Sequence, residues 1–401
     1  MSQATETLRV ARAPHVRIVG AVSAAHFVSH FYILLLAPLL PFVRSEYNVS
    51  YTEIGLALAA FNIVSTALQT PVGFLVDWLG ARILLIAGLV VGGGAFAAAG
   101  MVDSFWFLVA MFALAGVGNT VYHPAGYALL SQHVPGDRIG QAFSVHTFAG
   151  MLGSAVAPAS LLMMQNLWGW RGAFIGAGVL GLAVAALLIL MRDNGPAQAA
   201  PARSGVDSGP VGWRLMLSGP ILLNLVFFAL LAIMSGGMYN YSAVALGALN
   251  GTPVAIANIA LSTFLLLSAF GVLIGGLVVG RTTRHALVAS LGLAAIALLT
   301  LMIAYIDLGD WLLILVMTVC GFFYGVIMPS RDMMVRAITP PGSFGKVFGF
   351  VTTGFNIGGI ISPLIFGAIM DHGSPRMVFV GVAAFTLIAI ATVATRPKPV
   401  A

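Results

Sequence analysis

Four histidines lie inside long apolar stretches of this chain, where ionisable side chains are costly and usually functional. His26 and His30 are four residues apart, so they share one face of a helix. Counted at about 1.5 Å per residue from the cytoplasmic ends of their stretches, these two residues, His123 and His146 lie roughly 12 to 18 Å deep. Imidazole has an unperturbed pKa of about 6.5 and can exchange a proton at physiological pH. The spacing therefore favours a shared polar centre that couples protons or binds substrate.

A single buried histidine can instead complete a core hydrogen bond, so a functional role is favoured only because the four share one layer. Four imidazoles could also ligate a transition-metal ion. No Asp, Glu or Cys joins them within the apolar stretches of the same half, and the one cysteine, Cys320, is interpreted as packing. The sequence therefore predicts no metal site, and no cofactor is expected.

Arg331 and Asp332 form the second ionisable group, about 8 to 9 Å from the end of an apolar stretch in the other half. Arg331 can bind an anionic group bidentately, and Asp332 can tune it or carry a proton. The alternative is a charged pair at the end of a helix that belongs to the cytoplasmic gate. The depth of the pair is compatible with both substrate binding and gating.

Other polar side chains at similar depth can orient a ligand, although any one can simply bridge two helices. The candidates for substrate binding are Tyr32, Asn119, Tyr122, Tyr324 and Asn356. The pair Gly236 and Gly237, followed by Tyr239, is expected to break its helix near the periplasmic end and to act as a gate.

The elements that position these residues follow from composition. Of the 401 residues, 60% are hydrophobic and 7% charged, against about 25% charged in soluble domains. The apolar runs do not alternate, so they predict membrane helices rather than a β-barrel. The sequence thus predicts an all-α polytopic membrane protein, and its net charge of +6 needs no nucleic acid as a partner.

Twelve stretches are long enough to span a bilayer, and one polar segment divides them into six plus six. We expect a cytoplasmic tail over 1–17, a six-helix bundle over 18–191, a cytoplasmic linker over 192–214, a second six-helix bundle over 215–395 and a tail over 396–401. The expected spans are 18–43, 53–76, 82–102, 106–133, 139–164, 171–191, 215–240, 253–279, 285–306, 311–337, 344–370 and 376–395.

The basic residues indicate the orientation. Of 18 Lys and Arg, only Arg44, Arg171 and Arg376 fall on the side opposite the termini and the linker. Because positive residues concentrate on the cytoplasmic side, both termini are predicted to be cytoplasmic. Only two of the 18 basic residues are lysines, Lys346 and Lys398, and with abundant Ala and Gly this composition favours a bacterial inner membrane.

An internal repeat relates the two halves. A shift of 205 residues pairs identical residues without a gap, among them Trp106 with Trp311, Pro124 with Pro329 and Gly153 with Gly358. The matches place the fourth to sixth spans in register with the tenth to twelfth. The halves are therefore parallel repeats, as in many transporters with alternating access.

Two segments carry a family resemblance. The loop between the second and third spans reads Gly73-Phe-Leu-Val-Asp77-Trp-Leu-Gly80-Ala-Arg82, and with twelve spans and a central linker it resembles the major facilitator superfamily. The stretch from Gly116 to Gly126 contains a His-Pro pair that is similar to the fosmidomycin-resistance-like branch of efflux proteins.

The resemblance implies the major facilitator fold, with the first and fourth helices lining a cavity. It also implies a gating role for the loop, in which Gly73 and Gly80 allow close helix approach. Asp77 and Arg82 would then help to latch the bundles on the cytoplasmic side. In that picture the partner is the eleventh helix, which Ser343 could cap.

No phosphate loop, nucleophile-base constellation or dinucleotide fingerprint is present in the sequence, so an enzyme is not expected and a gradient must drive transport. We expect a monomeric, proton-coupled antiporter that exports a small organic compound by alternating access. The first alternative is a symporter or uniporter that imports a small organic anion. An alternative of another class is a membrane sensor that binds its ligand without moving it.

Overall fold

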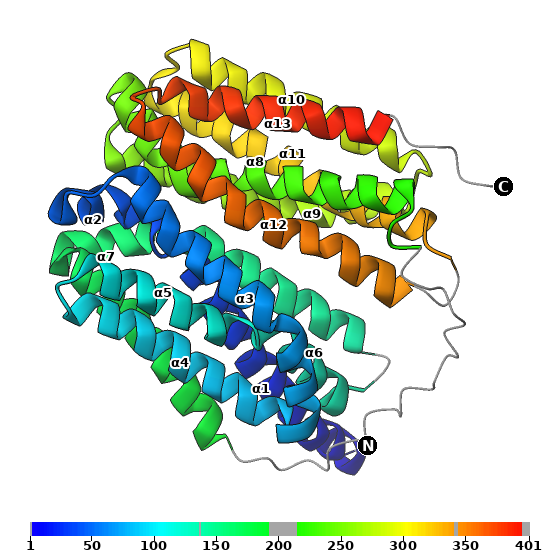
Figure 1. Cartoon of the computed structure of the whole chain (residues 1–401). Coiled ribbons are helices and arrows are strands. Elements are labelled where there is room, and N and C mark those ends of the chain that lie inside the picture. Colours follow the sequence, from blue (N-terminus) through cyan, green and yellow to red (C-terminus); the bar gives the residue numbers. More distant parts are fainter. Residues whose placement is uncertain (1, 136–137, 192–214, 341–343, 395–401) are drawn as a thin grey trace. The chain divides into compact units, whose positions relative to one another are not determined.

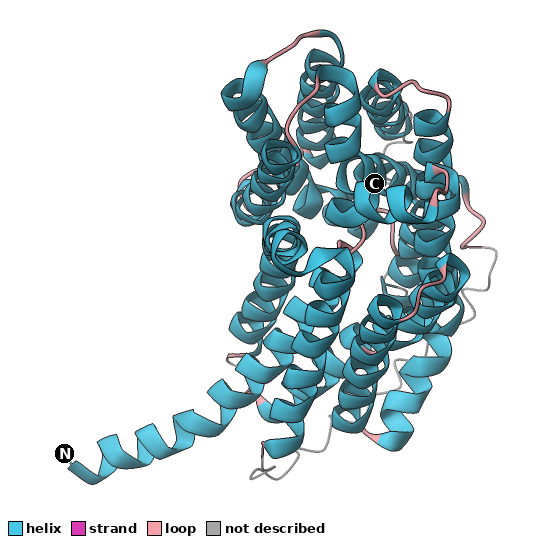
Figure 2. Cartoon of the chain, turned by 90° about the vertical axis from the view of Figure 1, so that its left-hand side faces the viewer, coloured by secondary structure: helices cyan, strands magenta, loops and turns pink. Residues whose placement is uncertain are grey.

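The computed structural model describes residues 2–135, 138–191, 215–340 and 344–394, and in these residues it contains helices and loops but no strand (Figure 2). The elements are α1 (Ser2–Ile33), η1 (Ala37–Leu39), α2 (Leu40–Tyr47), α3 (Tyr51–Leu79), α4 (Ala81–Met101), α5 (Phe105–Asn119), α6 (Tyr122–His133), α7 (Ile139–Leu190), α8 (Gly219–Asn250), α9 (Val254–Val279), α10 (His285–Tyr305), α11 (Gly309–Ala337), α12 (Phe344–Asp371) and α13 (Arg376–Ala394) (Figure 1). The prediction of an all-α polytopic membrane protein is confirmed.

Eleven helical stretches among the described residues are long and apolar enough to cross a membrane. One of them lies in α7, whose 52 residues would measure about 78 Å at 1.5 Å per residue, more than twice the thickness of a hydrocarbon core. The backbone of Gly169 leaves the helical region, with φ 72° and ψ 169°. Gly169 therefore divides α7 at the boundary between two predicted spans, which accounts for twelve.

Proline interrupts the helix within the first and fourth predicted spans. The first helix already starts at Ser2 and stops at Ile33, and the stretch predicted to continue to residue 43 is instead η1 and the start of α2. Pro38 and Pro41 at the starts of those two elements lack the N–H of a continuing helix. Pro124 likewise cannot bond the carbonyl of Thr120, and the fourth span is divided there into α5 and α6.

Large apolar side chains cover the outer faces of the helices. On α10, Leu287, Leu291 and Leu298 follow one another at helical spacing and are 50%, 62% and 69% exposed. Such a face is unfavourable in water and suits contact with lipid.

The helices form two compact units. Unit 1 comprises Met1–Leu35, Ile63–Ser154 and Met164–Ser204, and unit 2 comprises Leu36–Asn62, Ala155–Met163 and Gly205–Ala401. Within unit 1, α4 packs on α5 and α1 on α6. Within unit 2, α9 packs on α11, α8 on α12 and α13, and α10 on α13. The predicted linker, the C-terminal tail and the Ser343 cap lie outside the described residues.

Glycines bring helix backbones together inside each unit. A Cβ on Gly153 of α7 would overlap the carbonyl of Phe27 in α1, and one on Gly358 of α12 would overlap that of Ala229 in α8. These two glycines are partners in the 205-residue repeat. The repeat therefore preserves the same close packing in both units.

The predicted break at Gly236 and Gly237 is wrong, since α8 runs unbroken from Gly219 to Asn250. A Cβ on Gly236 would overlap the Ser362 side chain, and one on Gly237 would lie 2.6 Å from Cζ of Phe366. The two glycines thus make room for α12. In lipid, a continuous helix also keeps the backbone hydrogen bonds satisfied.

Candidate functional site

The four predicted histidines meet in unit 1, and three helices bring them together. The ring centroid of His26 in α1 lies 4.6 Å from that of His30, 5.0 Å from that of His123 in α6 and 4.0 Å from that of His146 in α7. His146 stacks on His26 with an interplanar angle of 13°, whereas the other two rings meet His26 edge-on. We call these four residues the histidine centre.

Two hydrogen bonds orient the rings of α1. Nδ1 of His26 lies 2.7 Å from the carbonyl oxygen of His146, and Nδ1 of His30 lies 3.2 Å from Oγ of Ser154. A carbonyl oxygen only accepts, so Nδ1 of His26 carries the hydrogen and Nε2 carries a lone pair. That Nε2 is buried and has no hydrogen-bond partner.

Two glycines make room for the rings. A Cβ on Gly150 would lie 2.6 Å from Cε1 of His26 and 2.9 Å from Cδ2 of His30, and one on Gly126 would lie 3.0 Å from Cε1 of His146. The centre is therefore tightly packed. Its side chains differ in exposure, since His26 and His146 are 3% and 1% exposed, His30 is half-buried and His123 is exposed.

The other candidates of unit 1 lie outside this cluster. The hydroxyl of Tyr32 donates to the carbonyl of Ala177 at 3.1 Å, and that of Tyr122 donates to the carbonyl of Gly88 at 3.4 Å. The amide of Asn119 lies 3.4 Å from Oγ of Ser65. These bonds join helices within unit 1, and the role of the three side chains in substrate binding stays a prediction.

The loop motif is partly described. Gly80 has φ 92°, which favours glycine, and it directly precedes α4. Arg82 donates from Nη2 to the carbonyls of Leu188, at 2.8 Å, and Met191, so it satisfies the carboxyl end of α7. The surroundings of Gly73 and the side chain of Asp77 are outside the described part of the structure, and a latching role for the motif stays a prediction.

Arg331 and Asp332 form a pair in unit 2. Nε and Nη2 of Arg331 both lie 2.8 Å from Oδ1 of Asp332, and Nη1 lies 2.9 Å from Sδ of Met328. The guanidinium also lies over two phenyl rings, 4.7 Å from that of Phe228 and 4.9 Å from that of Phe355. The side chain of Arg331 is 12% exposed and that of Asp332 is 43% exposed.

The sequence interpretation missed Phe228 and Phe355. The repeat carried a usable signal, because its 205-residue offset pairs Phe355 with Gly150 and Arg331 with Gly126. Positions that make room for imidazoles in unit 1 thus hold the guanidinium and one of its aromatic partners in unit 2.

The remaining candidates of unit 2 are Tyr239, Tyr324 and Asn356. The ring centroids of Tyr239 and Tyr324 lie 6.1 Å apart, and both rings contact Phe264. Asn356 is half-buried on α12.

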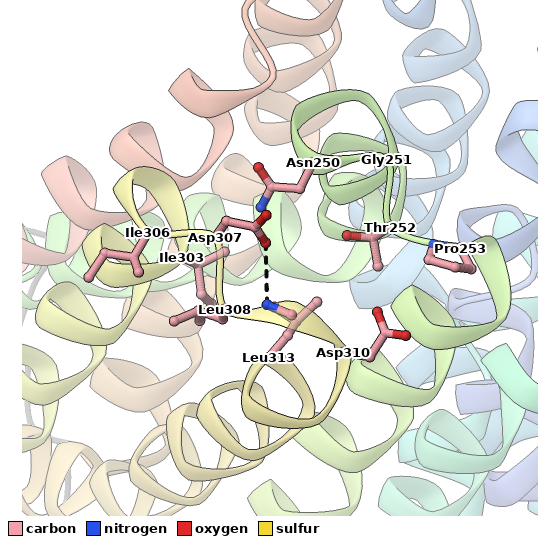
Figure 3. Close-up of a pocket in the computed structure, with 11 residues that line it drawn as sticks. Asn250, Gly251, Thr252, Pro253, Ile303, Ile306, Asp307, Leu308, Asp310 and Leu313 are labelled. Atoms are coloured by element: carbon pink, nitrogen blue, oxygen red, sulfur yellow. Dashed lines mark hydrogen bonds between the residues drawn. The ribbon is translucent and has the colours of Figure 1, made fainter.

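A polar pocket of about 220 Å³ lies where α8 meets α9 and α10 meets α11 (Figure 3). Its acidic residues are Asp307 and Asp310, and Oδ1 of Asp307 accepts a hydrogen bond from the backbone N–H of Gly309 at 3.2 Å. None of the predicted site residues lines it.

Comparison with known proteins decides the family. The model of the Major Facilitator Superfamily matches residues 22–250 and 225–401. The chain belongs to the major facilitator superfamily. It is accordingly a multi-pass membrane transporter for small molecules rather than an enzyme.

Curated relatives include the fosmidomycin resistance protein of Escherichia coli strain K12, 24% identical over 384 residues that cover 94% of this chain and 92% of that protein. The multidrug resistance protein MdtH of Aeromonas hydrophila is 23% identical over 80% of the chain and 79% of its own length. The resemblance to the fosmidomycin-resistance-like branch is thereby confirmed.

Solved structures share the fold of this major facilitator protein. A bacterial homologue of the human lysosomal transporter Spinster, in an inward-facing and unoccupied conformation, matches with a TM-score of 0.82. The match covers 97% of this chain and all of that one, at 13% identity. The nucleoside transporter NupG matches with a TM-score of 0.79 over 96% of this chain and 99% of that one, at 14% identity.

Proposed function

We propose that this major facilitator protein exports a small organic compound across the bacterial inner membrane in exchange for protons, by alternating access. The observation that carries the proposal is the match to the fosmidomycin resistance protein over 94% of the chain. The similarity to a multidrug resistance protein over 80% of the chain supports the same direction of transport. We further propose that both termini are cytoplasmic and that the protein acts as a monomer.

A gradient supplies the energy in this proposal. The sequence contains no phosphate loop of the kind that binds ATP. Ionisable residues within spans commonly mark ion or substrate pathways, and here Asp332 offers a carboxyl group that is 43% exposed. We assign the coupling proton to Asp332.

The charge of the substrate then decides the sign of coupling. Protonation of Asp332 removes its negative charge and leaves the guanidinium of Arg331 without its anionic partner. The uncompensated cation repels a cationic substrate, so proton and substrate exclude each other and the result is antiport. It attracts an anionic substrate, so proton and substrate bind together and the result is symport.

The same pair supports the second candidate function, import of a small organic anion by symport or uniport. Arg331 lies over the neighbouring rings of Phe228 and Phe355 and pairs with Asp332, and these contacts would present its guanidinium in a fixed orientation. Guanidinium is well suited to bidentate binding of carboxylate or phosphate.

The test is proton flux in proteoliposomes that contain a pH dye, challenged with cationic drugs, phosphonates and organic acids. When substrate flows out of the proteoliposomes, antiport brings protons in and acidifies the lumen. Symport carries protons out and makes the lumen more alkaline. Asp332→Asn should abolish the proton signal while substrate counterflow persists, and Asp307→Asn, in the loop before α11, serves as the control. Unchanged proton flux in Asp332→Asn would exclude this residue as the carrier.

A ligand sensor gives a different result. It would bind a compound from the panel without accumulating or exchanging it. Binding without counterflow in the wild-type protein would therefore contradict both transport proposals.

A further inference from the structure

Three members of the histidine centre have the geometry of a metal-binding site. One ring nitrogen from each of His26, His30 and His123 lies within 4.8 Å of the corresponding nitrogens of the other two. His26 and His30 stand at positions i and i+4 of α1, a spacing with which helices present two imidazoles to one zinc ion. His123 approaches from α6, next to the break at Thr120 and Val121.

The surroundings prepare one nitrogen of each α1 ring for a ligand role. The hydrogen bond from Nδ1 of His26 to the carbonyl of His146 leaves the lone pair on Nε2, which is buried and without a hydrogen-bond partner. The hydroxyl of Ser154 can accept the Nδ1 hydrogen of His30 in the same way. Histidines that bind metals usually donate their second nitrogen to such an oxygen, which fixes the tautomer and the ring.

We propose that His26, His30 and His123 bind one divalent transition-metal ion. Neutral imidazole suits Zn²⁺, Ni²⁺, Co²⁺ and Cu²⁺, whereas Mg²⁺ and Ca²⁺ prefer oxygen ligands. Zinc–nitrogen bonds of about 2.0 to 2.1 Å place tetrahedral ligands about 3.3 Å apart. The three nitrogens reach that spacing when each moves inward by about 1 Å, through small rotations of the side chains.

Three protein ligands leave the fourth tetrahedral position open. His123 is the exposed member of the three, so the further ligand would join the ion on its side. Three neutral imidazoles do not compensate two positive charges in a region of low dielectric constant. An anion, such as hydroxide or an anionic group of a small molecule, is therefore the favoured fourth ligand.

This inference goes beyond the proposed function and does not depend on it. All three ligands and both orienting oxygens belong to unit 1, whereas the coupling pair Arg331 and Asp332 belongs to unit 2. Metal binding is measured without transport, so failure of one proposal leaves the other standing.

The experiment is Zn²⁺ titration of the full chain in detergent, purified with a tag that contains no histidine and followed by calorimetry at neutral pH. We expect one Zn²⁺ per chain. His30→Gln and His123→Gln should each weaken binding at least tenfold, a loss of the order seen even for residues that only support metal ligands. His372→Gln is the matched control, since this exposed histidine follows α12 in unit 2 and bonds the carbonyl of Ala368 four residues earlier.

Thermal unfolding and size-exclusion chromatography show whether each variant is folded. If a variant does not fold, X-ray absorption of the Zn²⁺-loaded wild-type protein counts the imidazole ligands directly. Three imidazoles support the proposal and fewer overturn it. Absence of Zn²⁺ binding by the wild-type protein, or equal affinity in His30→Gln, His123→Gln and His372→Gln, would also overturn it.

Discussion

At the scale of single residues, the histidine centre depends on two glycines, which have no side chain. Gly150 and Gly126 leave the space that the imidazoles of His26, His30 and His146 occupy. Packing at this density makes even one added methyl group costly. The glycines are therefore as much a part of the site as the rings.

Gly150→Ala should destabilise the protein by about 1 to 3 kcal/mol, because the new Cβ would lie 2.6 to 2.9 Å from atoms of His26 and His30. The measurement is thermal unfolding in detergent. Gly94→Ala is the control, because a Cβ there has no neighbour within 4 Å and alanine favours a helix by about 0.5 to 1 kcal/mol over glycine. Equal unfolding temperatures for the two variants would contradict the packing argument.

Arg331→Lys tests the guanidinium in unit 2. A lysine ammonium keeps the charge but lacks the planar fork with which Arg331 bonds Asp332 through two nitrogens and lies over the rings of Phe228 and Phe355. If Arg331 binds substrate, the apparent KM in counterflow should rise about tenfold, which corresponds to about 1.4 kcal/mol. An unchanged KM with a lowered maximal rate would assign Arg331 to gating.

At the scale of elements, side chains from one helix complete the ends of another. Asp371, the last residue of α12, accepts hydrogen bonds from the backbone N–H groups of Tyr51, at 2.6 Å, and Thr52, at 2.8 Å. It also accepts one from the hydroxyl of Thr52 at 2.6 Å. The first turn of α3 thus receives its N-terminal cap from a residue some 320 positions away in the chain.

Asp371→Ala should lower the stability of the protein by about 0.5 to 2 kcal/mol, the usual cost of losing a cap. Thr52→Val removes only the hydroxyl bond and should cost less. Since the two side chains contact each other, the double variant should be more stable than the sum of the single losses predicts. Strict additivity in thermal unfolding would show that the two residues act independently.

At the scale of the whole molecule, one repeated architecture carries two different chemistries. The offset of 205 residues pairs His123 with Met328, Gly126 with Arg331 and Gly150 with Phe355. Unit 1 uses these positions for imidazoles, and unit 2 uses them for a guanidinium beside two phenyl rings. A duplicated fold can thus diverge in its sites while its helix packing stays the same.

The orientation of the whole molecule is tested by labelling cysteines. Cys320 is the only cysteine and is buried, so Cys320→Ala provides a background without thiols. In intact cells, a membrane-impermeant maleimide should label His372→Cys, in the loop after α12, but not Ser204→Cys in the predicted linker. Labelling of Ser204→Cys would reverse the proposed topology.

Much of the fold was predictable because its signal is local. A membrane helix needs about 20 apolar residues in succession, so the spans can be inferred without tertiary contacts, whereas the orientation that Lys and Arg indicate stays a prediction. Proline is a weaker local signal, because the helix is interrupted before Pro124 whereas α11 continues through its repeat partner Pro329. The layer shared by His26, His30, His123 and His146 also follows from helix geometry alone.

Tertiary structure decided which of those residues meet. His26, His123 and His146 lie on three helices whose rotations depend on packing along their whole length, which the sequence does not encode in any short segment. The break predicted at Gly236 and Gly237 was wrong because it, too, depended on contacts with another helix. A glycine pair loosens an isolated helix, but here it makes room for Ser362 and Phe366 on α12. The sequence alone determined the elements and their order, whereas the contacts between distant helices determined the sites.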